Sequence, residues 1–144
     1  MPVFADQSRE SMRRAYFDAW RRSRAGAVLT PLEAQIARVI EEHPEYHAWL
    51  ERGEATLAEE FTPEGGRGNP FLHLGMHLAI REQVATDRPG GIRALHAQLA
   101  MRAGGALEAE HRMMEVLGAT LWDAQRAGRA PDERAYLERL RRLA

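Results

Sequence analysis

Apolar residues recur along this chain every three or four positions, which is the period of an α-helix. The clearest stripe runs through Leu32, Ile36, Val39 and Ile40. It follows the start signal TPLE, in which threonine and glutamate form a capping box around a proline at the first helical position. No stretch shows the two-residue alternation of β-branched residues that is typical of strands. The pattern therefore predicts an all-α fold.

The same periodicity, read with its start and stop signals, predicts six or seven helices. We expect them at about 8–24, 31–43, 45–52, 70–86, 92–102, 107–127 and 131–143. The segment EATLAEEF, residues 54–61, could form a further short helix. A chain of 144 residues falls in the usual size range of one domain. We therefore expect residues 1–144 to form one compact helical bundle.

The helix at about 70–86 should lie at the centre of that bundle. Asn69 is a good helix cap and Pro70 suits the first helical position. On a helical wheel of this segment, apolar residues occupy nearly every direction, and only Gly75 and Glu82 mark a side that faces solvent. A helix that is apolar almost all round is expected to be buried.

Composition excludes several kinds of chemistry. The chain has no cysteine, which rules out thiolate zinc sites, iron–sulfur clusters and cysteine nucleophiles. Every basic side chain is arginine, so a pyridoxal phosphate Schiff base and the lysine of a nucleotide-binding phosphate loop are excluded as well. A net charge of −1 argues against general affinity for nucleic acid.

The sequence also predicts a cytoplasmic protein. The first ten residues, MPVFADQSRE, lack the basic and apolar regions of a signal peptide. No apolar run approaches the roughly 18 residues that a membrane span needs. We therefore expect no association with a membrane.

Histidines carry the most informative chemical signal. His73 and His77 are four residues apart on the predicted central helix, so both rings lie on one helix face. His43 and His47 repeat the spacing in the segment HPEYH. On the helix at 107–127, four more groups could contribute metal ligands: Glu108, Glu110, His111 and Glu115. Pairs of histidine and carboxylate on facing helices are a common source of ligands for divalent metals.

Two hypotheses follow from these residues. In the first, His73 and His77 bind one divalent metal ion, zinc or iron, and His43 or His111 completes the site together with Glu110. Glu110 could instead act as a general base, or it could accept a hydrogen bond from one of the metal-binding histidines and so orient its ring. The reaction could be hydrolytic or redox. A dinuclear site would also require Glu59, Glu60 or Glu115 to turn inward.

The second hypothesis needs no metal. His73 or His77 would form a buried polar network with Glu110 or Tyr46 and fix the packing of two helices. The chain would then be a non-catalytic protein-interaction module or a homodimer.

Two further features have ordinary structural explanations. The loop EGGRGNP could hold an anion beside Arg67 at the start of a helix, but a capped connection explains it as well. Arginines and aromatic residues on the helix at 8–24 could contact nucleic acid, although aromatic residues at helical spacing usually pack in the core.

Three segments of the chain resemble a bacterial family called domain of unknown function 1841. They are NPFLHLGMHLAIREQVATDRPGGI, the preceding HPEYH and the later AEHRMMEVLG. The resemblance spans most of the chain and implies no activity. It implies that the family signature concentrates on His43, His47, Asn69, Pro70, His73, His77, Glu82, Gln83, Glu110 and His111.

Overall fold

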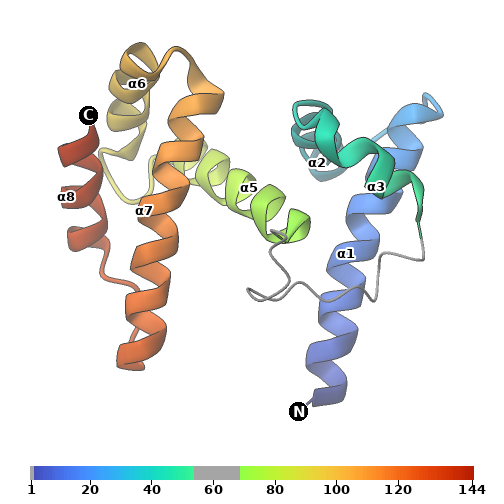
Figure 1. The fold of residues 1–144 in the computed structure, drawn as a ribbon, viewed down its shortest axis with the longest axis horizontal. Helices are drawn as coiled ribbons and strands as arrows, with labels where there is room; N and C mark the ends of the chain where they lie inside the picture. Colours follow the sequence, from blue (N-terminus) through green and yellow to red (C-terminus); the bar gives the residue numbers. More distant parts are fainter. Residues whose placement is uncertain (1, 54–68) are drawn as a thin grey trace. The chain divides into compact units, whose positions relative to one another are not determined.

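A computed structural model describes residues 2–53 and 69–144, with side chains described from residue 10 onward (Figure 1). Its elements are α1 (Pro2–Arg24), α2 (Pro31–Glu41), a 3-10 turn η1 (Pro44–Tyr46), α3 (His47–Glu51), α5 (Pro70–Thr86), α6 (Ile92–Ala103), α7 (Ala106–Ala127) and α8 (Glu133–Leu143). These seven α-helices, with no strand in the described ranges, confirm the all-α prediction and the predicted number of helices. The predicted helix at 54–61 and Arg67 lie outside the described residues.

The chain divides into two compact units, and the boundary falls inside α5. The first unit ends at Leu78 and the second runs from Ala79 to Ala144. Each unit is described by itself below, and the expectation of one domain over residues 1–144 stays a prediction. Helix α5 carries fully buried side chains on both sides of the boundary, Leu74 in the first unit and Ile80 in the second, as predicted for a helix that is apolar almost all round.

In the first unit, α1 and α2 lie side by side (Figure 1). Their core also takes residues from α3 and from the first turns of α5. It consists of Tyr16, Ala19, Trp20, Ile36, Val39, Ile40, Trp49, Leu50, Phe71 and Leu74. This core places the end of α2 and the start of α5 next to the same apolar cluster.

The inward face of α1 differs from the prediction by about one position. Helical spacing groups Met12 with Tyr16, so it predicts Met12 in the core and Arg13 on another face. In the structure Met12 is 62% exposed and Arg13 is buried. Arg13 lies three and four residues before Tyr16 and Phe17, so it shares their face. Its guanidinium lies over the ring of Phe71, 4.6 Å from the centroid, and its aliphatic stem can be buried with little cost. The helix also begins at Pro2 rather than near Ser8.

The start of α2 has the predicted capping box. The Thr30 hydroxyl accepts a hydrogen bond from the Glu33 backbone N–H, and the Glu33 carboxylate accepts one from the Thr30 N–H. Val39 and Ile40 are fully buried, as the stripe predicted. Leu32 is 62% exposed, because it lies in the first turn, before α2 reaches the core.

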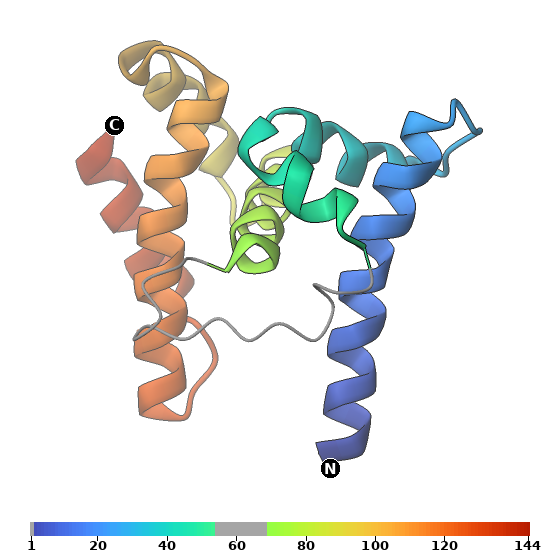
Figure 2. The same cartoon turned by 45° about the vertical axis from the view of Figure 1, so that its right-hand side comes forward.

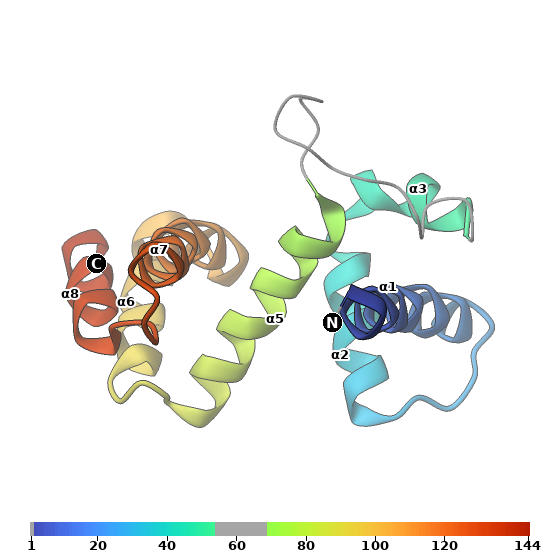
Figure 3. The same ribbon diagram turned by 90° about the horizontal axis from the view of Figure 1, so that it is seen from below.

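The second unit contains α6, α7 and α8, each packed against the other two (Figures 2 and 3). Met113 and Leu117 of α7 are buried with Leu140 of α8. Helical spacing puts Leu121 on the same face as Met113 and Leu117 and so predicts it in this core, but Leu121 is 41% exposed. Gly128 ends α7 with φ at +64°, a conformation that glycine adopts without steric cost.

Two smaller predictions need correction. The last helix begins after Asp132, whose carboxylate caps it by accepting the Ala135 N–H, so Pro131 lies outside the helix. On α5, Gly75 was expected to face solvent, yet it is half-buried, and a Cβ there would lie 3.4 Å from the Tyr16 hydroxyl. Glu82 is exposed, as predicted.

Within the described ranges, no helix has the length and apolarity needed to cross a membrane.

Candidate metal centre

Three histidines of the first unit bring their ring nitrogens together. His43 follows the end of α2, and His73 and His77 lie one turn apart on α5. The Nε2 atom of His73 is 3.2 Å from Nε2 of His43 and 3.2 Å from Nε2 of His77. One nitrogen from each of the three rings lies within 4.8 Å of the others. The sequence prediction that these imidazoles converge is therefore confirmed for this trio.

The orientation of His43 is set by the local backbone. Pro44 follows it and disfavours continuation of α2, and His43 leaves the helix with φ −126° and ψ 69°. Its Nδ1 atom lies 2.7 Å from the backbone oxygen of Val39. Because a carbonyl oxygen can only accept, Nδ1 must carry the hydrogen, and Nε2 of the neutral ring then has a lone pair. That lone pair is on the side of the ring that faces His73.

His47 has a structural role, although it belongs to the same HPEYH segment. Its Nε2 atom lies 2.9 Å from the backbone oxygen of Ile40, and its ring packs on Trp20 with centroids 4.5 Å apart. The first contact ties the turn after α2 to the end of that helix, and the second packs it against α1. Of the two histidines in the segment, only His43 belongs to the trio.

The spacing of the nitrogens matches what a shared metal ion requires. Zinc binds imidazole nitrogen at about 2.0–2.1 Å, so two nitrogens on one tetrahedral ion are about 3.3 Å apart, and two at a right angle are about 2.9 Å apart. The observed 3.2 Å falls between these values. The ring planes are inclined at 60° to 77° to one another, which rules out parallel stacking of any two of the rings.

The trio is largely removed from solvent. His77 is fully buried, His43 is 4% exposed and His73 is half-buried. Tyr46 borders the group, with its ring stacked on His43 at 5.7 Å and edge-on to His73 at 5.9 Å. Burial raises the pKa of the Tyr46 hydroxyl, and the nearby Glu45 charge adds to the shift. This phenol therefore stays neutral at physiological pH.

The other predicted site residues belong to the second unit. Glu110 is buried, as expected, and both of its carboxylate oxygens accept from Nε of Arg81 at 3.1 Å. His111 lies 3.6 Å from the Glu108 carboxylate on the same helix. Glu115 is exposed, and Glu59 and Glu60 fall outside the described residues. The roles proposed for Glu110 and His111 stay predictions.

Arg81 is the polar partner that sequence reasoning missed. It lies four residues after His77, so the face of α5 that bears His73 and His77 continues into an arginine. That spacing, together with the inward direction of Glu110 on its own helix, was the available signal for the pair.

Comparison with known proteins supports the family but adds no activity. Neither the curated proteins nor the solved structures contain a match to the chain. The sequence profile described as domain of unknown function 1841 matches residues 8–142, nearly the whole chain. The chain therefore belongs to the family described as domain of unknown function 1841.

Proposed function

We propose that this protein binds one divalent transition-metal ion through the Nε2 atoms of His43, His73 and His77. The observation that carries the proposal is the position of His73 Nε2, 3.2 Å from the corresponding atom of each of the other two rings. Imidazole is a good ligand for zinc, iron, copper and nickel, and three such ligands define one face of a coordination sphere.

Counting hydrogens supports a cation at this point. A ring nitrogen carries at most one hydrogen, and that hydrogen cannot lie on the line to two neighbours at once. A metal ion can accept a lone pair from all three nitrogens together. The neutral tautomer that the Val39 carbonyl imposes on His43 is the form that can serve as a ligand.

The hydrogen bond on the far side of the His43 ring resembles one that is common at established metal sites. Histidines that bind metals commonly donate their other ring N–H to a carbonyl or carboxylate, which fixes both the tautomer and the ring direction. His43 makes such a bond to Val39 at 2.7 Å. The carbonyl belongs to a buried residue of α2, so core packing holds this ligand in place.

An ion held by these three residues alone would keep at least one position for water or substrate, as in catalytic rather than structural zinc sites, whereas His111 would occupy that position if it also bound. A water bound there would have a lowered pKa and could act as a nucleophile in hydrolysis. An iron ion in the same site would support redox chemistry instead. The neutral Tyr46 hydroxyl beside the trio would suit either as a hydrogen-bond donor.

The competing function is an interaction module or homodimer in which the histidines are structural. The observation that favours it is the stacking of Tyr46 on His43, an aromatic contact that would stabilise the cluster without a metal. Metal content decides between the two.

The experiment uses untagged protein, because a polyhistidine tag would itself bind metal. Elemental analysis after purification and after dialysis against zinc or ferrous iron should give about one ion per chain. His43→Ala, His73→Ala and His77→Ala should each lose the ion while circular dichroism shows that the helices remain. Wild-type protein that neither carries nor takes up stoichiometric metal would refute the proposal.

The matched control is His47→Gln. It removes a histidine from the same HPEYH segment, but one whose Nε2 already bonds to Ile40. It should keep wild-type metal content. If His47→Gln abolished binding while His43→Ala did not, the ligand assignment would be wrong.

A further inference from the structure

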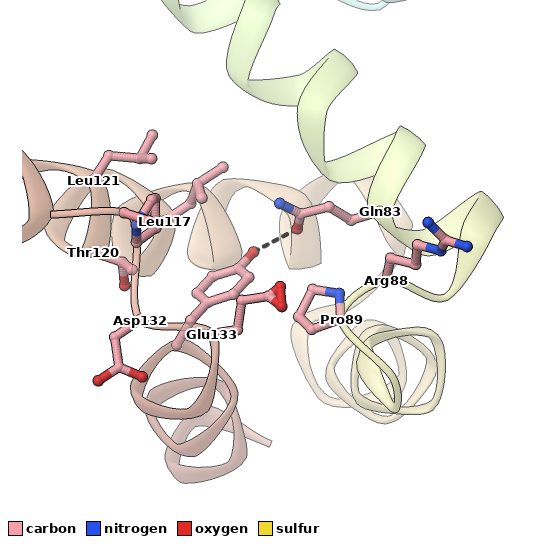
Figure 4. Close-up of a pocket in the computed structure, with 11 residues that line it drawn as sticks. Gln83, Arg88, Pro89, Leu117, Thr120, Leu121, Asp132 and Glu133 are labelled. Carbon is pink, nitrogen blue, oxygen red and sulfur yellow. Dashed lines mark hydrogen bonds between the residues drawn. The ribbon is translucent and has the colours of Figure 1, made fainter.

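The second unit contains a cleft of about 440 Å³, formed where the end of α5, the middle of α7 and the start of α8 meet (Figure 4). This volume is within the range of sites that hold small molecules. Leu117 and Tyr136, both buried, form part of its wall, and Leu121 and Pro89 add further apolar surface. The cleft is made entirely by residues of one unit, and none of the trio histidines lines it.

One polar pair is built into this apolar wall. The Tyr136 hydroxyl donates a hydrogen bond to Oε1 of Gln83 at 2.7 Å, as Figure 4 shows. Burial raises the pKa of Tyr136 well above its usual value, so the hydroxyl keeps its hydrogen and remains the donor. In this arrangement Oε1 of Gln83 takes the Tyr136 hydrogen, and Nε2 with its two hydrogens lies on the other side of the amide. No described residue accepts a hydrogen bond from that nitrogen.

The other polar groups near the cleft either form hydrogen bonds with residues outside it or are exposed at its mouth. The Thr120 hydroxyl donates to the Val116 backbone oxygen and accepts from Arg139. Asp132 accepts from the Ala135 N–H and in Figure 4 points away from the Gln83–Tyr136 pair. Arg88 and Glu133 are exposed and of opposite charge, so the mouth favours neither an anion nor a cation strongly.

We propose that this cleft binds a small, uncharged, largely apolar molecule whose carbonyl or amide oxygen accepts a hydrogen bond from Nε2 of Gln83. The apolar part of the ligand lies against Leu117, Leu121 and Tyr136. The fixed amide selects an acceptor, and the mixed charge at the mouth disfavours a net charge on the ligand.

Three probes of nearly equal shape test the assignment: phenylacetamide, phenylacetate and phenethylamine. Binding to the full-length protein is followed by two-dimensional NMR, with the Gln83 side-chain amide as reporter. Phenylacetamide should bind most tightly and shift that resonance. The charged analogues should bind about tenfold more weakly, which is the effect expected when a charged group faces an unmatched neutral site.

Two variants locate the binding. Leu121→Trp should fill the cleft and abolish the shifts, and it begins from a residue that is already 41% exposed. Met101→Trp is the matched control, because Met101 is 87% exposed on α6 of the same unit and does not line the cleft. It should bind phenylacetamide as the wild type does.

Gln83→Glu keeps the shape of the side chain and still accepts the Tyr136 hydrogen bond, but replaces the donor by a negative acceptor. It should reverse the preference, so that phenethylamine becomes the tightest probe. The proposal is overturned if no probe binds saturably to the wild type, if Leu121→Trp leaves binding unchanged, or if wild-type protein already prefers the amine. In the last case Glu133 rather than Gln83 would select the ligand.

Discussion

His43 donates its Nδ1 hydrogen to the backbone oxygen of Val39, 2.7 Å away, and so turns Nε2 toward the other two histidines of the trio. A side chain on an irregular turn would otherwise sample several ring orientations. Here the last turn of a buried helix selects one tautomer and one direction. The proposed metal centre depends on this bond as much as on the two histidines of α5.

The first prediction concerns that tautomer. Nitrogen-15 NMR of the metal-free protein should show His43 protonated at Nδ1, because only that nitrogen can donate to Val39. Adding zinc should then shift Nε2 of His43, His73 and His77 and leave the ring of His47 unchanged. A His43 ring protonated at Nε2 in the absence of metal would contradict the geometry.

Metal should also stabilise the folded protein. An ion that binds only the native state at about 100 times its dissociation constant adds about 2.7 kcal/mol to the free energy of unfolding. Thermal melts with excess zinc should therefore shift upward by several degrees, and a chelator should reverse the shift. His77→Ala should melt at the same temperature with and without zinc, whereas His47→Gln should respond as the wild type does.

A third prediction concerns Arg81 and Glu110. Glu110→Ala should lower the free energy of unfolding by about 2 kcal/mol, since it removes two charge-assisted contacts. The cost stays below the roughly 3–5 kcal/mol of a fully buried broken pair, because the Arg81 side chain is 25% exposed and can regain water. Urea denaturation of both single variants and of the double variant with Arg81→Met measures their coupling.

The same Glu110 variant tests the role predicted from sequence. If Glu110 only pairs with Arg81, Glu110→Gln should retain wild-type metal content. Loss of the ion in a folded Glu110→Gln protein would support the earlier prediction that Glu110 completes the site. His111→Ala, analysed in parallel, tests the corresponding prediction for His111.

Thr30→Ala should destabilise the first unit by about 1 kcal/mol, because the hydroxyl satisfies the Glu33 N–H at the start of α2. Thr30→Ser keeps the hydroxyl and should be nearly neutral. Hydrogen exchange at the amides of the first turn of α2 would locate the effect. Equal destabilisation by alanine and serine would show that the cap contributes little.

The last prediction concerns alkaline pH. Burial raises the pKa of Tyr136 in the folded state above its ordinary value of 10.0. The neutral phenol therefore contributes stability that is complete below pH 10 and is lost as the pH rises toward the higher folded value. Tyr136→Phe should lose about 1 kcal/mol at neutral pH with the Gln83 hydrogen bond, yet its stability should decline less steeply above pH 10. Equal slopes for the two proteins would contradict the assignment.

The sequence by itself determined most helix boundaries that a cap or a breaker marks, although it placed the start of the last helix at Pro131 rather than after Asp132. The Thr30 capping box and the Asn69 cap start helices as predicted. Pro44 and the glycines at 53 and 128, residue types that interrupt helices, lie just after helix ends. These signals act through a few neighbouring backbone groups, so they can be recognised in the sequence without knowledge of the tertiary structure. The four-residue spacing likewise determined that His73 and His77 share a face.

Tertiary structure decided which histidine joins them and what each polar group contacts. His43 and His47 lie in the same HPEYH segment, and no local signal separates their roles. Packing of the turn on Trp20 places the His47 ring against the Ile40 carbonyl, whereas His43 lies beside the other two histidines of the trio. Burial of Arg13 beneath Phe71, exposure of Met12, and the pairing of Arg81 with Glu110 depend equally on distant residues. Local periodicity fixes the side of a helix that is apolar to within about one residue, whereas the contacts of each side chain depend on how neighbouring helices pack against it.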